Sequence, residues 1–199
     1  MSNTPKRKSK SGAAPSRPRP TTSRASSTNW RRIGAFAVGG TVAVALLYGV
    51  LFGGGDEDLP EGAPDGVALI TIAEANHVAG DIDYDMAVPA GGDHNVEVAP
   101  CQFYDGFVRP ENVLHALEHG AVWATYRRDL GADDIDALSG LTRGRRELLI
   151  SEMPDQPAPL ILTAWGAQLE MPGFDEVTVR QFYREFNDGV FAPEPGASC

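Results

Sequence analysis

The stretch PENVLHALEHGAVWATYR, residues 110–127, predicts a helix that is followed at once by a strand. Proline and glutamate suit the first turn, because proline fixes the backbone angle there and the acidic side chain lies at the positive end of the helix dipole. Gly120 is expected to end the helix just after His119. Residues 121–127 are rich in β-branched and aromatic side chains and therefore predict a strand.

Similar signals lie on both sides of this stretch. Short apolar runs predict further strands at residues 67–72, 147–151 and 160–165. Helices are expected at residues 133–141 and from residue 175 onward, where apolar side chains follow the spacing of one helical face. Residues 85–110 are rich in Gly, Pro and Asp and predict long loops. The pattern predicts the α+β class, with one compact mixed α/β domain built on a small sheet.

An uncharged run of twenty residues, IGAFAVGGTVAVALLYGVLF, lies at residues 33–52. As a helix it would span about 30 Å, the thickness of the hydrocarbon core of a bilayer. Two arginines precede the run and an acidic stretch follows it, which predicts that the N-terminus lies inside the cell. We therefore expect a single-pass protein of the cytoplasmic membrane, with one transmembrane helix at residues 30–52 that contacts the lipid bilayer through residues 33–52.

The rest of the chain divides around this helix. Residues 1–29 are basic and have few large apolar side chains, which predicts a disordered cytoplasmic tail. Residues 53–65 predict an acidic flexible linker. Residues 66–199 are then expected to form an extracytoplasmic domain.

The charge of the chain is strongly segregated. All 27 acidic residues follow the apolar run, together with only eight of the 17 basic residues. A surface with so large a negative charge repels nucleic acid, so a nucleic-acid partner is excluded, whereas cations are compatible with it. The sequence does not identify a protein partner.

The chain has two cysteines, Cys101 and Cys199, and both follow the apolar run. An even number of cysteines in an oxidising compartment favours a disulfide. The alternative is that Cys101 is a soft metal ligand and that Cys199 lies in a free C-terminal tail.

All four histidines lie close together in the sequence, and two of them flank an acidic residue in the predicted helix. Residues four apart lie on the same helical face, so the two helical imidazoles can approach one ion, with the glutamate beside them. The other two histidines lie in loops that could reach the same place. We predict a divalent metal site for Zn or Cu whose ligands are His77, His94, His115, Glu118 and His119.

Two other interpretations of these residues stay open. The letters HALEH match the inverted zinc-protease motif H-x-x-E-H, in which the histidines bind zinc and the glutamate activates water, so a zinc-dependent hydrolase is one alternative. The other is an envelope structural or interaction module whose histidines are only structural. Because the motif is short, we favour a non-enzymatic metal-binding domain and assign no catalytic residues.

Five blocks of sequence together are similar to a known bacterial family. They are NHVAGDIDYDMAVPAGGDHN (76–95), CQFYDG (101–106), ENVLHALEHGAVWATY (111–126), LTAWGAQL (162–169) and PEPGASC (193–199). In order, they resemble the family of domain of unknown function 3105. The resemblance covers residues 70–199 and implies the same layout of tail, single transmembrane helix and outer domain. It supplies no catalytic residues, but every residue of the predicted metal site falls inside these blocks.

Overall fold

The computed structural model describes residues 59–189, 191–196 and 199. The predicted tail, the predicted transmembrane helix and the first part of the predicted linker therefore lie outside the described residues. Within the described ranges, no helix is both long and apolar enough to cross a membrane.

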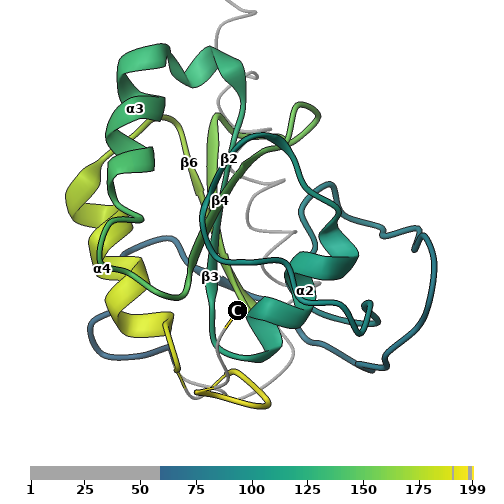
Figure 1. Ribbon diagram of the computed structural model, residues 1–199. Helices are drawn as coiled ribbons and strands as arrows, with labels where there is room; N and C mark the ends of the chain where they lie inside the picture. Colours follow the sequence, from purple (N-terminus) through teal and green to yellow (C-terminus); the bar gives the residue numbers. More distant parts are fainter. Residues whose placement is uncertain (1–58, 190, 197–198) are drawn as a thin grey trace, which may run out of the picture. The chain divides into compact units, whose positions relative to one another are not determined.

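A mixed six-stranded sheet forms the centre of the described domain, with the strand order β1-β6-β5-β3-β4-β2 (Figure 1). Strands β2, β4 and β3 run parallel, whereas β3, β5, β6 and β1 pair antiparallel. The strands are β1 (Ala68–Leu69), β2 (Phe103–Phe107), β3 (Val122–Tyr126), β4 (Leu148–Glu152), β5 (Leu160–Ala164) and β6 (Ala167–Met171). Parallel neighbours need a long crossover connection, and α3 (Ala132–Gly140) lies in the one between β3 and β4.

Helices cover both faces of the sheet (Figure 1). The described chain has α2 (Pro110–Glu118) on one face, and α3 with α4 (Glu176–Phe186) on the other, besides a short 3-10 helix, η2 (Arg128–Leu130). Strand β3 is buried on both faces, and its successive side chains point to opposite faces of the sheet. Trp123 packs with α2, whereas Val122 and Tyr126 pack with α3 and α4. The predicted mixed α/β domain is thus confirmed, although its sheet is not small.

Most of the predicted elements are confirmed, and the exceptions are the two edge strands, β1 and β2, and the interior strand β6. The predicted loop at 85–110 is wrong at β2, whose sequence FYDGF contains turn-forming Asp and Gly but pairs with β4 along an irregular register. Strand β6 was not predicted, although its sequence AQLEM alternates apolar and polar residues. Its polar residue Gln168 is buried, and Nε2 donates to Val88 O and Thr163 Oγ1. The predicted strand at 67–72 is reduced to the two residues of β1.

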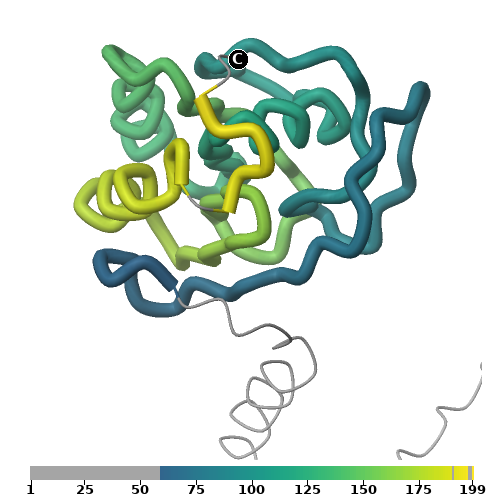
Figure 2. Tube along the Cα trace, turned by 90° about the horizontal axis from the view of Figure 1, so that it is seen from below, coloured from purple at the N-terminus to yellow at the C-terminus, as the bar shows by residue number. Residues whose placement is uncertain are grey.

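Gly120 brings the chain that follows α4 against the end of α2. Its φ angle of 99° is one that side chains disfavour, and a Cβ there would lie 2.9 Å from Cα of Asp188. Asp188 also donates its backbone N–H to Gly120 O at 2.9 Å. Figure 2 shows the yellow C-terminal segment folded back on the domain. The glycine that ends the helix therefore also makes room for the C-terminus.

A disulfide joins Cys101 to Cys199, with their Cα atoms 5.4 Å apart, and confirms the predicted pairing. The alternative interpretation of Cys101 as a metal ligand is wrong, because its sulfur is bonded to Cys199. The bond closes a loop whose ends are 98 residues apart in sequence. It holds the C-terminus beside the chain that leads into β2.

We expect removal of this disulfide to lower the free energy of unfolding. For a loop of about 100 residues, the entropy of the unfolded chain predicts a loss of about 4–5 kcal/mol. The measurement is denaturant unfolding of the full chain in detergent, with and without a reductant. The double variant Cys101→Ser with Cys199→Ser is the control, and the reductant should not change its stability. A wild-type protein that is equally stable after complete reduction would contradict this expectation.

Candidate metal centre

Two loops ahead of α2 bring the first two histidines together. His77 and His94 form an isolated parallel bridge, in which Val78 N–H donates to His94 O at 2.8 Å and His94 N–H donates to Asn76 O at 3.0 Å. The Asp93 carboxylate strengthens this bridge by accepting from both the backbone N–H and the side-chain amide of Asn76, each at 2.9 Å. Residues 17 apart in sequence are thus held side by side.

Helix α2 supplies the other two members of the cluster from its last turn. His115 and Glu118 lie three residues apart and are each 7% exposed. The loop that carries His94 is fixed to the start of the same helix, because Asn95 N–H donates to Glu111 O at 2.9 Å. The helix and the loops are therefore positioned by backbone hydrogen bonds that do not involve the histidine rings.

The side chains of His77, His94, His115 and Glu118 converge on one place, where one ligand atom from each lies within 4.8 Å of all the others. Glu118 Oε2 lies 3.1 Å from His94 Nε2 and 3.5 Å from His77 Nε2. These separations lie on either side of about 3.3 Å, the ligand–ligand distance of a tetrahedral zinc site with bonds of about 2.0–2.1 Å. The three imidazole centroids form a near-regular triangle with sides of 4.6, 4.8 and 5.2 Å.

Backbone carbonyls fix the orientation of the two buried rings. His94 Nδ1 lies 2.8 Å from Gly92 O, and His115 Nδ1 lies 3.0 Å from Asn95 O. A carbonyl only accepts, so in both rings Nδ1 carries a proton and donates it. The neutral form of each ring then has its lone pair on Nε2. Metal-ligating histidines typically make this bond with the nitrogen that does not bind the metal.

The electrostatics of the cluster favour the neutral, ligating form of His115. Burial lowers the pKa of His115, and the nearby imidazole of His119 lowers it further. His94 is completely buried beside the Glu118 carboxylate, and Trp165 covers it edge-on with a centroid distance of 5.8 Å. A carboxylate in such a place requires a compensating positive charge.

His119, the fifth predicted ligand, lies in a second group of side chains. It is the C-terminal cap of α2, and its ring approaches that of His115 with centroids 4.6 Å apart. Its metal-ligating neighbours are Glu118 and Glu194, with ligand atoms within 4.8 Å of one another. Glu194 was not predicted from the sequence. The one signal that pointed to it was its place five residues before Cys199, in the tail that the predicted disulfide ties down.

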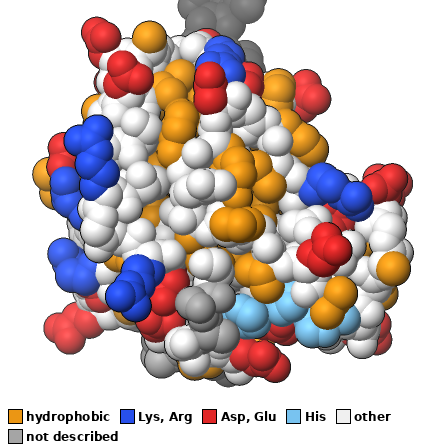
Figure 3. Space-filling view, viewed as in Figure 1, with side chains coloured by type: hydrophobic (Ala, Val, Ile, Leu, Met, Phe, Trp, Pro, Cys, Tyr) orange, Lys and Arg blue, Asp and Glu red, His pale blue; other side chains and the backbone are white. Residues whose placement is uncertain are grey.

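The histidines are accessible from solvent at one edge of the cluster. The side chain of His77 is 47% exposed, in contrast to the buried ring of His94. Figure 3 shows histidine side chains at the surface as a small pale-blue patch with acidic side chains nearby. An ion could therefore reach the cluster without unfolding of the domain.

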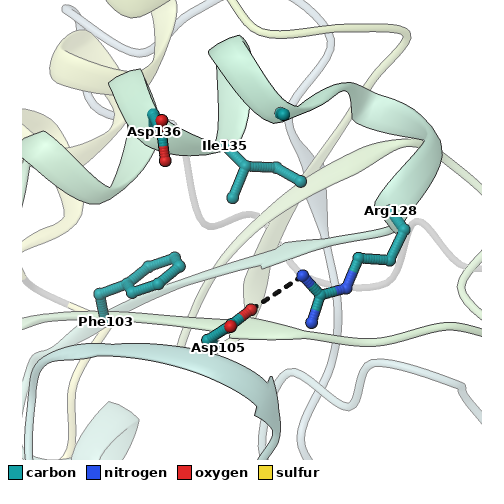
Figure 4. Close-up of a pocket in the computed structure, with 6 residues that line it drawn as sticks. Phe103, Asp105, Arg128, Ile135 and Asp136 are labelled. Carbon is teal, nitrogen blue, oxygen red and sulfur yellow. Dashed lines mark ion pairs between the residues drawn. The ribbon is translucent and has the colours of Figure 1, made fainter.

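A hollow of about 320 Å³ lies elsewhere, between β2 and α3. Figure 4 shows Asp105 paired with Arg128 in it, beside the side chains of Phe103 and Ile135. Arg128 is held by Asp105 at 2.8 Å and by Glu152 at 2.9 Å, so its charge is already compensated. The hollow has no histidine in its lining, and the histidine cluster remains the better candidate site.

A family model matches residues 77–199, more than half of the chain. The match spans every histidine and both cysteines, and it agrees with the resemblance found in the sequence blocks. No curated protein and no solved structure matches the chain. The chain belongs to the family whose description reads "Protein of unknown function (DUF3105)".

Proposed function

We propose that the domain binds a divalent metal ion through His77, His94, His115 and Glu118, and that Zn(II) is the ion that fits best. The observation that carries the proposal is the orientation of the two buried imidazoles. Each donates Nδ1–H to a backbone carbonyl, which leaves Nε2 to carry the lone pair of the neutral ring. In His94 this Nε2 lies 3.1 Å from Glu118 Oε2, and His115 belongs to the same group of ligand atoms.

An ion explains this arrangement better than hydrogen bonding does. Without a cation, a hydrogen bond between His94 Nε2 and Glu118 needs an extra proton on one of the two groups, because the other nitrogen of the ring already donates to a carbonyl. A proton on the ring would place a charged pair where that ring is fully buried, which desolvation opposes. A proton on the carboxyl could serve only one of the two histidines that lie against Oε2. A divalent ion lets all the ligands direct lone pairs at one positive charge.

The ligand set favours zinc over copper. Three imidazoles and one carboxylate suit both metals, but Cu(II) prefers a square-planar or tetragonal arrangement. The triangle of rings, with the carboxylate about equally far from two of their nitrogens, is closer to a tetrahedron.

The same geometry supports metal binding without catalysis at this group. In the hydrolase alternative, His115 and His119 hold the ion and Glu118 activates water. Here Glu118 Oε2 lies at ligand distance from two other histidines, and four protein ligands close a zinc site. The second alternative, an envelope module with structural histidines, requires the cluster to be equally stable without metal.

We expect zinc to bind the full chain and to stabilise it. The protein would be purified in detergent without a histidine tag and depleted of metal by dialysis against a chelator. Zinc at about 100 times its Kd should raise the free energy of unfolding by about 2.7 kcal/mol, because the ion binds only the folded state. Mass spectrometry of bound metal and thermal unfolding measure the two effects.

His77→Ala is the informative variant, because this side chain is half-exposed and its loss leaves the buried rings in place. It should weaken zinc binding by at least about tenfold, since one ligand is lost. The matched control is Glu74→Ala, an exposed residue of the same loop outside the cluster, which should bind like the wild type. A wild-type protein that takes up no metal and keeps its melting temperature in zinc would favour the structural module.

We further propose that the domain is tethered outside the cytoplasmic membrane by residues 33–52. The uncharged run, the arginines before it and the acidic residues after it support this topology. The disulfide is a second argument, because such bonds persist in oxidising compartments and are rare in the cytosol.

The full chain should be recovered with the membrane fraction and should need detergent for release. Val42→Arg combined with Ala43→Arg should shift the protein out of that fraction, because each arginine near the centre of a span costs about 2.5–3.5 kcal/mol. Leucine at both positions is the control and should keep the membrane association. Recovery of the unaltered chain in the soluble fraction without detergent would refute the anchor.

A further inference from the structure

A second group of metal-ligating side chains lies next to the first and shares one residue with it. The group consists of Glu118, His119 and Glu194, whose ligand atoms all lie within 4.8 Å of one another. We propose that this group binds a second divalent ion, so that Glu118 joins two ions in one binuclear centre. The inference rests on the proposed function, because Glu118 is also a ligand of the first ion.

The imidazole of His119 has no hydrogen bond among the described residues. Its Nδ1 is buried without a partner, and its Nε2 lies 3.9 Å from Glu194 Oε2, which is too far for a hydrogen bond. Two ligands of one tetrahedral zinc ion, with bonds of about 2.0–2.2 Å, lie about 3.3–3.6 Å apart, so a shift of about 0.3–0.6 Å would bring both atoms to one ion. A largely buried ring with a free lone pair, facing a carboxylate so close to that separation, is a ready metal ligand.

The backbone holds Glu194 in this place independently of its side chain. Glu194 N–H donates to Glu118 O at 3.0 Å, which joins the C-terminal segment to the last turn of α2. Two residues later, Gly196 N–H donates to the Asp188 carboxylate at 3.0 Å, and the segment ends in the disulfide at Cys199. The Glu194 side chain is 67% exposed, and within residues 59–189, 191–196 and 199 its one ion pair is with His119.

An ordinary surface ion pair between His119 and Glu194 would contribute about 0–1 kcal/mol, which does not offset a buried His119 Nδ1 without a hydrogen-bond partner. The shared residue supplies a further argument. Glu118 is in both groups, and a carboxylate has two oxygens with lone pairs for two ions.

The two ions would differ in what they can bind. The first group offers four protein ligands, which complete a tetrahedral zinc site. The second offers three, which leaves at least one position for water or a small oxygen-donor ligand from solution. The second ion is therefore the one at which an exogenous ligand would bind.

Zinc titration of the metal-free full chain in detergent tests this inference by counting ions. The wild type should bind two Zn per chain, and Glu194→Gln should bind one, with the affinity of the first site unchanged. Glu194 is exposed, so this substitution leaves the fold intact. Glu97→Gln, an exposed carboxylate outside both groups, is the matched control and should bind two.

The outcomes separate the inference from the proposed function. A wild type and a Glu194→Gln variant that each bind one ion would refute the second site and leave the first intact. Two ions in both proteins would place the second ion elsewhere and overturn the role of Glu194. No zinc in the wild type would refute the proposed function and the inference together.

Discussion

The burial of the Glu118 carboxylate among imidazole rings is the constraint that the rest of the site must satisfy. A buried carboxylate is tolerated only where positive charge or strong donors compensate it. Here two neighbouring histidines direct Nε2 at Glu118 Oε2, and the better-buried of these rings donates its other nitrogen to a carbonyl. A metal ion bound among these side chains would supply the positive charge that compensates the carboxylate.

The fold places this carboxylate by ending a helix at a fixed point. Gly120 stops α2 one residue after His119 and lets the chain after α4 approach the helix end. On the sheet side, Trp123 at the start of β3 packs with Leu114 and Leu117 of α2 and fixes the helix on its face. The disulfide fixes the C-terminal segment to the domain. This one segment therefore takes part in both the disulfide and the candidate site.

The sequence predicted the parts of this domain that local pattern controls. The helix and strand at 110–127 followed from proline, glycine and the apolar spacing, and helical geometry placed His115 and His119 on one face with Glu118 beside them. Strand β2 lacks such a pattern, because FYDGF has turn-forming residues. Strand β6 does alternate apolar and polar residues in AQLEM, and this short signal was missed. Their pairing depends on contacts between distant parts of the chain.

The candidate site was predictable only in part for the same reason. The bridge between His77 and His94 is a long-range backbone contact that no spacing rule predicts, and Glu194 reaches the site through the fold of the C-terminus. His119 lies beside His115 as helical spacing predicts, with ring centroids 4.6 Å apart, but its ligand atoms group with Glu118 and Glu194. Helical periodicity fixes neighbours within α2 but not the direction in which the last residue turns.

Anomalous diffraction at the zinc edge, from crystals of the zinc-loaded protein, shows directly whether a zinc ion binds among these four side chains. We expect a strong peak about 2.0–2.2 Å from Nε2 of His94 and from a carboxylate oxygen of Glu118, with His77 and His115 completing the coordination. A zinc-loaded crystal with no peak among these four side chains, and with the same ring orientations, would contradict it.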